Sequence, residues 1–292
     1  MIPKSINKIC IFNNYVSTRE IPPILYDILI QWYHQVKIVR FLEYDREDVL
    51  YIIICPANIS YKIYQKGPMY YITYQVETYN SLKTPNYRQF LKEALYNWDF
   101  SSYNCSSDLS KELKLKYNPI GYHPALTHPD IRNSTRGYSD SHKDIDVLFL
   151  GYIGASPRRA QIKAQLDELK ISNLFISTLD LPGMQRMIGR SKICIDIRQQ
   201  DFITDVATLR MNILLSNQAC IISEEVINTE DMELYRQGGV IFVPYDQMIK
   251  TIQKMLPDFE RRYSAAVSSY EWYITHRKWE NIFDFKREFP FQ

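Results

Sequence analysis

The segment from Gly151 to Arg159 has the residue types of an anion-binding loop. It reads Gly-Tyr-Ile-Gly-Ala-Ser-Pro-Arg-Arg and directly follows an apolar run. Ser156 and Pro157 are typical of the start of a helix, where backbone N–H groups lack partners and favour an anion. Glycine lets the backbone approach a ligand closely, and Arg158 adds positive charge. The pattern predicts a phosphate or diphosphate site; the structural alternative is a capped helix with two solvated arginines.

Two carboxylates, Glu77 and Asp99, each stand at the carboxyl end of an expected strand. Open parallel α/β sheets bind their ligands at this edge. A carboxylate within hydrogen-bond reach of a hydroxyl can take its proton as the oxygen attacks an electrophilic carbon. We therefore predict a general base here, and the alternative is that both side chains cap helices or pair with Arg and Lys. Polar residues near them in the sequence are predicted to bind the same substrate: Gln75, Ser101 and Asn104.

Asp144 and Asp146 form an Asp-x-Asp sequence, a pattern that can hold a divalent cation on a diphosphate. They stand between a polar segment and an apolar run, so we interpret them as the start of a strand. The five histidines show neither H-x-x-x-H nor H-E-x-x-H spacing. The sequence thus predicts no metal site and no metal cofactor.

The elements that must position these residues follow from short apolar runs that alternate with helical periodicity, as in parallel α/β proteins. The first half is expected to contain a helix at 23–34 and strands at 8–12, 37–41, 50–54, 70–74 and 94–98, with a last strand near 119–124. The second half is expected to contain strands at 146–150, 173–177, 192–197, 219–222 and 240–243, and helices at 156–169, 182–189 and 206–216. Two doubly wound sheets follow from this order.

A segment poor in apolar residues, 127–143, has the composition of a linker between the two patterns. We predict an N-terminal Rossmann-like domain over residues 1–135 and a C-terminal Rossmann-like domain over residues 143–255. Residues 256–292 are rich in aromatic and basic residues, and we predict helices there that return toward the first domain. A chain of 292 residues is long enough for two such cores.

The overall charge excludes some partners. Thirty-five Lys and Arg against 33 Asp and Glu give a net charge of +2, too small to predict binding to nucleic acid or to an anionic membrane. The five cysteines are odd in number and scattered, which favours reduced thiols in a reducing compartment. No window approaches about 18 uninterrupted apolar residues, so we expect a cytoplasmic protein without an integral membrane segment. The oligomeric state stays open.

Several segments, in order, resemble small GT-B glycosyltransferases of bacteria and large DNA viruses. In the first half, residues 71–77 (YITYQVE) and 98–104 (WDFSSYN) are similar to the YIxYQxE and WDYSxxN segments of that family. In the second half, the similar segments are 146–151 (DVLFLG), followed by Arg158 and Arg159, then 191–197 (SKICIDI), 209–217 (LRMNILLSN) and 221–225 (IISEE). The resemblance extends over about residues 48 to 250, and the joint order is more specific than any one segment.

The resemblance implies an α/β protein of two Rossmann-like domains facing a cleft. The implied activity is the metal-independent transfer of a hexosyl or pentosyl group from a nucleotide-diphosphate-sugar to a carbohydrate or glycoprotein acceptor, as in glycan biosynthesis. Glu77 or Asp99 would act as the base in the first domain, and the polar residues named with them would lie on the acceptor side. The implied donor-binding residues of the second domain are Gly151, Tyr152, Arg158, Asp196, Asp205, Thr208, Arg210, Ser223 and Glu224.

One position departs from the family. The family usually has a glutamate three residues before the helix arginine, where it holds the donor ribose, and this chain has Ala207 there. Asp205 is the nearest carboxylate, and we expect it to take over the ribose contact, with Asp201 as the upstream alternative. Two other functions stay open. A nucleotide-sugar epimerase on the same fold would act on the donor alone, and a non-catalytic sugar- or nucleotide-binding protein is the reading that Ala207 favours.

Overall fold

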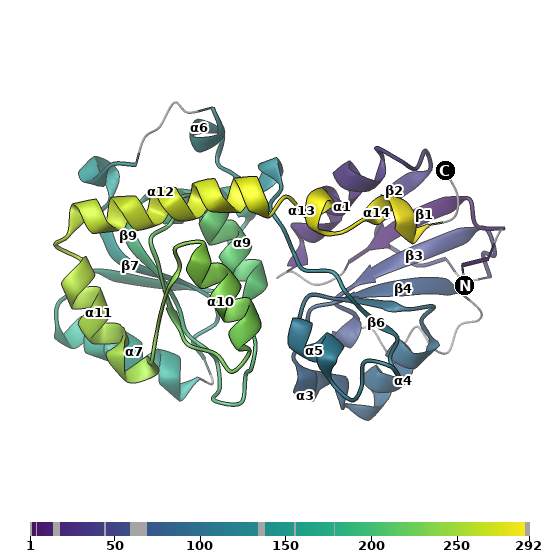
Figure 1. Ribbon diagram of the computed structural model, residues 1–292, viewed down its shortest axis with the longest axis horizontal. Helices are drawn as coiled ribbons and strands as arrows, with labels where there is room; N and C mark the ends of the chain where they lie inside the picture. Colours follow the sequence, from purple (N-terminus) through teal and green to yellow (C-terminus); the bar gives the residue numbers. More distant parts are fainter. Residues whose placement is uncertain are drawn as a thin grey trace. The chain divides into compact units, whose positions relative to one another are not determined.

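The computed structural model describes residues 2–3, 5–13, 18–43, 45–58, 69–133, 138–154, 156–177 and 179–289. Its contacts divide the chain into two compact units. The first unit comprises Met1–Ile120 and Trp279–Gln292, and the second unit comprises Gly121–Lys278. Each unit is an α/β structure around a parallel sheet (Figure 1). This confirms the two Rossmann-like parts that the alternating pattern predicts.

The sheet of the first unit has the strand order β2-β1-β3-β4-β5-β6, and all its pairs are parallel. Its strands are β1 Lys8–Phe12, β2 Val36–Val39, β3 Val49–Ile54, β4 Tyr70–Gln75, β5 Asn97–Asp99 and β6 Leu115–Tyr117. The central strand β3 has the sequence VLYIII and is buried along its whole length. Such a continuous apolar run is typical of a strand that is covered by helices on both faces.

The helices of the first unit come from both ends of the chain. They are α1 Ile21–Leu29, α3 Tyr79–Leu82, α4 Pro85–Glu93, α5 Ser102–Ser106, α13 Trp279–Ile282 and α14 Phe285–Glu288, with a 3-10 turn η2 at Pro56–Asn58. The indole N–H of Trp279 donates to Asn118 Oδ1 at 2.9 Å, and the hydroxyl of Tyr33 donates to Phe285 O at 3.1 Å. The predicted return of C-terminal helices to the first unit is therefore confirmed for α13 and α14 (Figure 1).

The sheet of the second unit has the strand order β11-β10-β9-β7-β8, again with parallel pairs. Its strands are β7 Ile145–Leu150, β8 Asn173–Ile176, β9 Ser191–Asp196, β10 Ile221–Glu224 and β11 Ile241–Val243. Val147, Ile193 and Ile222 of three adjacent strands belong to one buried cluster. The order reverses between β7 and β9, so this pair of strands is the topological switch point of the sheet.

The helices of the second unit include the long helix α12, which packs on α9. They are α6 Pro129–Arg132, α7 Pro157–Glu168, α8 Leu181–Gly189, α9 Thr208–Ser216, α10 Thr229–Gln237, α11 Met248–Met255 and α12 Phe259–His276, with 3-10 turns η3 Pro124–Leu126, η4 Asp140–His142 and η5 Tyr245–Gln247. Ala266 and Tyr273 of α12 are fully buried, and Arg262 pairs with Asp140. The C-terminal segment predicted at 256–292 is thus divided between the two units. Helix α12 packs in the second unit, and only the residues after it pack in the first.

The chain enters the second unit earlier than the polar composition of 127–143 suggests. Leu126 O accepts hydrogen bonds from Gln185 Nε2 at 2.9 Å and from Asn217 Nδ2 at 2.8 Å, which ties η3 to α8 and to the end of α9. The sequence-based boundary at residue 135 lies outside the described residues. The strand expected near 119–124 is wrong: β6 ends at Tyr117, and Pro119 and Pro124 lack the N–H groups that a ladder needs.

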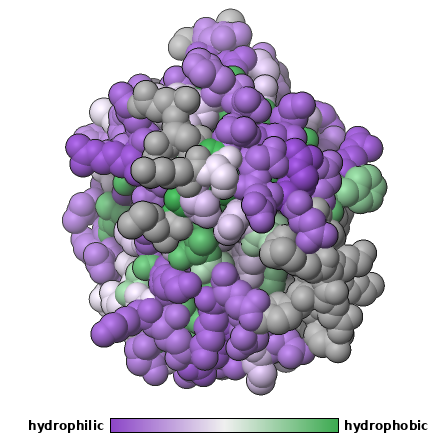
Figure 2. All heavy atoms as spheres, turned by 90° about the vertical axis from the view of Figure 1, so that its right-hand side faces the viewer, coloured by the Kyte–Doolittle hydropathy of each residue, from purple (hydrophilic) through white to green (hydrophobic). Residues whose placement is uncertain are grey.

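Hydrophilic side chains predominate on the face of the molecule shown in Figure 2, with hydrophobic side chains grouped near its middle. Among the residues that the structure describes, no helix combines the length and the hydropathy needed to span a membrane.

Candidate functional site

The loop after β7 is shaped by the side chains beneath it. A Cβ at Gly151 would lie 2.7 Å from Arg210 Nη2 and 2.9 Å from the Phe149 ring, so only glycine fits there without a shift. Ser156 caps α7, because its Oγ accepts from Arg159 N at 3.4 Å. The same Oγ donates to Gln199 O at 2.8 Å, in the loop after β9. The N-terminus of α7 is therefore held at the switch point of the sheet.

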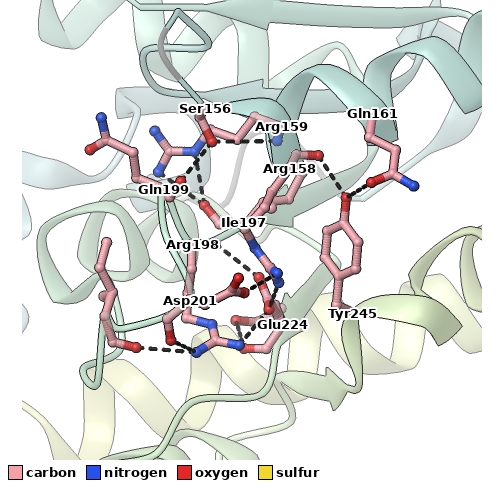
Figure 3. A network of polar contacts seen from close by, with 12 residues as sticks. Ser156, Arg158, Arg159, Gln161, Ile197, Arg198, Gln199, Asp201, Glu224 and Tyr245 are labelled. Atoms are coloured by element: carbon pink, nitrogen blue, oxygen red, sulfur yellow. Dashed lines mark hydrogen bonds and ion pairs between the residues drawn. The ribbon is translucent and has the colours of Figure 1, made fainter.

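Arg159 joins the two loops of the switch point. Its guanidinium donates to Ile197 O at 2.9 and 3.0 Å (Figure 3). It also donates to Tyr152 O at 2.7 Å and lies over the Phe149 ring. Burial and the nearby charge of Arg210 lower the pKa of Arg159 to about 10, so it stays charged at neutral pH. Because it is only 7% exposed, we assign it to holding the loops in place.

Arg158 points the other way, toward the end of β10. It forms ion pairs with Glu224 and Asp201, and its guanidinium lies 4.0 Å from the centre of the Tyr245 ring (Figure 3). The hydroxyl of Tyr245 donates to Arg158 O at 2.8 Å and to Gln161 Oε1 at 3.1 Å. The side chain of Arg158 is thereby fixed above the carboxyl edge of the sheet.

A second arginine shares the same carboxylate. Glu224 is 1% exposed and accepts from Arg198 N at 3.1 Å and from Arg198 Nη2 at 2.6 Å, besides its pair with Arg158. A buried carboxylate of this kind needs such partners, because an unpaired charge in the interior is very costly. The Nε groups of Arg158 and Arg198 are buried without a hydrogen-bond partner in the described part of the chain. The side chains of Arg158 and Arg198 are 18% and 16% exposed, so an anion can approach both guanidinium groups from solvent.

Arg210, on the first turn of α9, occupies the neighbouring position. It forms an ion pair with Asp196, donates from Nε to Leu150 O, and lies over the Phe149 ring. Ser223 Oγ donates to the other oxygen of Asp196 at 3.4 Å. The arginines are contacted from the protein interior by Asp196 and Glu224, and Ser223 contacts them through Asp196. All three of these polar residues are at most 4% exposed.

Four guanidinium groups and three directly paired carboxylates gather at this edge of the second unit. The arginines are Arg158, Arg159, Arg198 and Arg210, and the carboxylates are Asp196, Asp201 and Glu224. The excess of positive charge adds to the partial positive charge at the start of α7 and α9. An anion with several oxygens, such as a diphosphate, is the ligand that this arrangement favours.

The other residues predicted to bind the donor lie around the same edge. Tyr152 follows Gly151 and is 60% exposed. Thr208 is the first residue of α9 and is 4% exposed, while Ala207 precedes it without a side-chain cap. Asp205 is 5% exposed and accepts from Thr204 Oγ1 at 2.9 Å and from Asn228 Nδ2 at 3.3 Å. α9 therefore begins after Asp205, and the loop turns this carboxylate inward.

The residues singled out in the first unit form one cluster at the carboxyl ends of β4 and β5. Gln75 Nε2 donates to Asp99 Oδ2 at 3.1 Å, and Asn104 Nδ2 donates to both Asp99 oxygens at 3.2 Å. Ser101 caps α5, and its N–H donates to Asp99 Oδ1 at 2.8 Å. The structure thus brings together all of the residues that the sequence predicts on this side.

The two carboxylates of this cluster differ in exposure. Asp99 is 0% exposed and surrounded by donors. Glu77 is only half-buried, and its carboxylate accepts from Cys55 Sγ at 3.5 Å and from Ser81 Oγ at 3.4 Å. Burial and the neighbouring Glu77 charge raise the pKa of the Cys55 thiol, so it stays protonated. Of the two, Glu77 is the carboxylate that a solvent-side substrate can reach.

The Asp-x-Asp sequence has the structural role that its position predicts. Asp144 pairs with Arg190, and Asp146 pairs with Lys192 at 2.7 Å and accepts from Ser172 N at 3.2 Å. Within the described ranges, no group of three or more His, Cys, Asp and Glu side chains is placed to hold a metal ion.

Two residues of the second-unit site, Arg198 and Tyr245, were not predicted from the sequence, and Asp201 was considered only for the ribose. Arg198 and Asp201 lie in the loop that follows β9, and Tyr245 follows β11. All three come shortly after a predicted strand. The rule that ligands bind at the carboxyl ends of parallel strands could therefore have identified them. Arg198 is the most informative of them, because a positive charge directly after a buried strand needs a partner.

The fold is that of the GT-B glycosyltransferases, which consist of two Rossmann-like parts. No protein-family model and no curated protein sequence matches the chain. The proteins that are similar to this chain are solved structures with low sequence identity to it. At such identities a similar structure establishes the fold, and the function has to be argued from the residues of the site.

Three of these structures cover nearly the whole chain. An alpha-glucosyltransferase in complex with UDP and a 13-mer DNA containing an HMU base has 11% identity and a TM-score of 0.56, over 94% of this chain and 96% of its own. BGT of T4 phage, in complex with UDP and Mn2+, has 12% identity and a TM-score of 0.55, over 97% of this chain and 100% of its own. HepE of Anabaena, in complex with UDP, has 10% identity and a TM-score of 0.54, over 94% and 97%.

Proposed function

We propose that the protein is a glycosyltransferase that moves a hexosyl or pentosyl group from a nucleotide-diphosphate-sugar to a carbohydrate acceptor. The observation that carries this proposal is the group of arginines at the switch point of the second unit, where Arg158, Arg198 and Arg210 surround the start of α7 and α9. The three similar structures that contain UDP support a nucleotide-diphosphate ligand. A uridine nucleotide is the first candidate.

The proposed donor site stabilises the leaving group. As the bond between the anomeric carbon and the diphosphate oxygen breaks, negative charge develops on the diphosphate. In this proposal, Arg158 and the N–H groups at the start of α7 stabilise that charge once the diphosphate has displaced the exposed Asp201, while Tyr245 and Glu224 hold the guanidinium in place. Positioning and charge stabilisation then account for most of the catalysis, and no metal ion is required by the proposal.

The first unit supplies the acceptor side of the proposal. The acceptor hydroxyl must lose its proton as its oxygen attacks the anomeric carbon. Glu77 is the proposed base, because it is the partly exposed carboxylate of its cluster, whereas Asp99 is 0% exposed. A carbohydrate acceptor agrees with the net charge of +2, which provides little attraction for a nucleic-acid backbone.

The proposal is tested first by ligand binding. A ligand that binds only the folded state raises the melting temperature, so UDP and GDP should each be compared with UMP and GMP by thermal shift. We expect the diphosphates to stabilise the protein more than the monophosphates. Release of UDP or GDP from nucleotide-sugars is then measured with and without a panel of acceptors that includes oligosaccharides and DNA containing hydroxymethyluracil.

The outcomes separate the proposal from its rivals. Transfer to an oligosaccharide supports it, and transfer to the DNA would move the acceptor to nucleic acid. Conversion of the donor into its epimer without acceptor would indicate an epimerase. The lack of a carboxylate at position 207, where the chain has alanine, favours a non-catalytic binding protein. Binding of UDP without any hydrolysis or transfer above background would select that function.

A further inference from the structure

The backbone of Glu77 is held by side chains at both of its polar groups. Its N–H donates to Gln75 Oε1, and its carbonyl accepts from Gln75 Nε2 at 2.7 Å and from Asn104 Nδ2 at 3.0 Å. Residues between a strand and a helix commonly leave such groups to water. Here two amide side chains hold the peptide groups on both sides of Glu77. The Cα atom from which the Glu77 side chain extends therefore has little freedom to move.

Asp99 orients the two amides. Its carboxylate accepts from the NH2 groups of both Gln75 and Asn104 and has no hydrogen to donate when ionised. The NH2 ends of both amides are therefore turned toward Asp99 and toward the Glu77 carbonyl, and the oxygen of Gln75 is left to accept from Glu77 N. Tyr87 also donates to this oxygen, at 3.0 Å. Asp99 thus sets the direction of every side-chain bond that holds the Glu77 backbone.

Burial limits what else these residues do. Gln75, Asp99 and Asn104 are each 0% exposed, so they do not present polar atoms to a sugar at the surface. Cys55, whose thiol donates to Glu77 Oε1 at 3.5 Å, has a φ of +48°, a left-handed conformation that is costly for a residue with a Cβ. Strain of this kind persists where the surrounding structure enforces it. The cluster therefore converges on Glu77 from the ends of three adjacent strands, β3, β4 and β5.

We infer that Asp99, Gln75 and Asn104 are positioning residues for the general base Glu77, and that none of them binds the acceptor or takes the proton. The inference rests on the proposed function and refines it. Their effect on rate is expected because proton transfer and attack require the base within about 3 Å of the hydroxyl, and small misplacements are costly. The alternative, hydrogen bonding to the acceptor, predicts an effect only when an acceptor is present.

The test uses hydrolysis of the donor, in which water replaces the acceptor. We compare the rates at which nucleoside diphosphate is released from UDP-glucose, UDP-N-acetylglucosamine and GDP-fucose. The donor that is hydrolysed fastest is used for the variants. We expect Asn104→Ala to lower kcat at least about tenfold and Glu77→Gln to lower it about a hundredfold, with donor KM changed less than about twofold. The double variant should be no slower than Glu77→Gln alone, because a positioning residue acts only through the base.

The control is a buried amide at the start of β5, Asn97. Asn97 is 0% exposed and donates to Leu91 O at 2.9 Å, but it has no bond to Glu77 among the described contacts. Asn97→Ser should lower the melting temperature and leave kcat per folded molecule unchanged. If Asn104→Ala does not fold, Asn104→Ser replaces it, since serine is uncharged beside Asp99 and too short to donate to the Glu77 carbonyl. Titration with UDP gives the concentration of folded protein.

Each outcome has one meaning. A further loss of kcat when Asn104→Ala is added to Glu77→Gln would overturn the inference, as would an equal loss for Asn97→Ser. Unchanged hydrolysis in Asn104→Ala with lost transfer to an added acceptor would assign these residues to acceptor binding instead. Wild-type protein that neither hydrolyses any of these donors nor transfers their sugar to an added acceptor would refute the proposed function itself, and the inference with it.

Discussion

Arg158, in the first turn of α7, forms an ion pair with Glu224 at the end of β10, and the Glu224 carboxylate is only 1% exposed. Glu224 keeps Arg198 as a partner when Arg158 is removed, so Arg158→Ala is expected to fold. It should bind UDP more weakly by about 1.5–3 kcal/mol, the usual contribution of a hydrogen bond to a charged group. Isothermal titration calorimetry at constant salt measures this difference.

The matched control is Arg236→Ala, which removes an exposed arginine that pairs with Glu225 and Glu233 away from the cluster. Its UDP affinity should equal that of the wild type. If Arg158→Ala also binds UDP with wild-type affinity, the diphosphate contact belongs to Arg198 or Arg210 instead.

Asp201 is expected to compete with the ligand for Arg158. Its side chain is 80% exposed, in contrast with the buried carboxylate of Glu224 on the other side of the same guanidinium. An exposed ion pair contributes only about 0–1 kcal/mol, so a diphosphate can displace Asp201 at low cost. Asp201→Asn should therefore tighten UDP binding up to about fivefold. Asp167→Asn, an exposed aspartate on α7 that pairs with Lys163, is the control, and weaker binding by Asp201→Asn would mean that Asp201 supports the site.

Most of the fold follows from local sequence patterns. The strand predicted at Lys8–Phe12 has the bounds of β1, and the expected helix at 156–169 differs from α7 by one residue at each end. Continuous apolar runs and a Ser-Pro helix start are strong local signals. Short elements such as α3 and α5, with four and five residues, were not predicted, because so few residues carry no helical period.

The site was predicted less completely than the fold. Glycine, serine and arginine after β7 could be recognised because the anion-binding pattern is continuous in sequence. The partners of Arg158 are separated from it by 43 residues for Asp201 and by 66 for Glu224, so their contact exists only once the strands are ordered side by side. The roles of Gln75 and Asn104 depend on which amide end faces Asp99, and no sequence pattern carries that information.

Chelation should leave the activity intact. Asp144 and Asp146 are occupied by Arg190 and Lys192, and the described residues contain no metal-binding group of three or more ligands. We therefore expect nucleotide-sugar hydrolysis and UDP affinity to be unchanged in EDTA. The similar T4 phage structure contains Mn2+ with UDP, so manganese should be added back as the comparison. Loss of turnover in EDTA with recovery in manganese would contradict metal independence.

Trp279 is expected to stabilise the first unit from the far end of the sequence. It is 0% exposed, its indole donates to Asn118 Oδ1, and its ring lies 5.7 Å from those of Tyr74 and Phe285. Trp279→Ala should lower the unfolding free energy by about 3–5 kcal/mol, the usual cost of deleting a buried aromatic side chain. Denaturant unfolding followed by circular dichroism measures the loss. Phe41→Ala, at an 80% exposed position, should change it little.

Asp205 is expected to make the ribose contact that Ala207 lacks. One condition for this is met, because α9 begins at Thr208 and Asp205 lies in the loop before it. The carboxylate of Asp205 is 5% exposed and accepts from Thr204 and Asn228, so the ribose hydroxyls have to share it with these donors. A carboxylate that accepts hydrogen bonds from ribose hydroxyls distinguishes UDP from its 2′,3′-dideoxy analogue, and alanine does not. Wild-type protein should therefore prefer UDP, and Asp205→Asn should narrow this preference by about 1 kcal/mol, which is the net contribution of one hydrogen bond.

The control for this experiment is a second buried aspartate on the same partner. Asn228 Nδ2 donates to Asp231 Oδ2 at 2.8 Å and to Asp205 Oδ1 at 3.3 Å, and both aspartates are 5% exposed. Asp231→Asn should therefore reproduce any loss of stability while keeping the preference for UDP over the dideoxy analogue. If both variants narrow the preference for UDP over its dideoxy analogue equally, the effect comes from a disturbed loop, and Asp205 does not contact the ribose. No preference in the wild type would remove the ribose contact altogether and favour the non-catalytic binding protein.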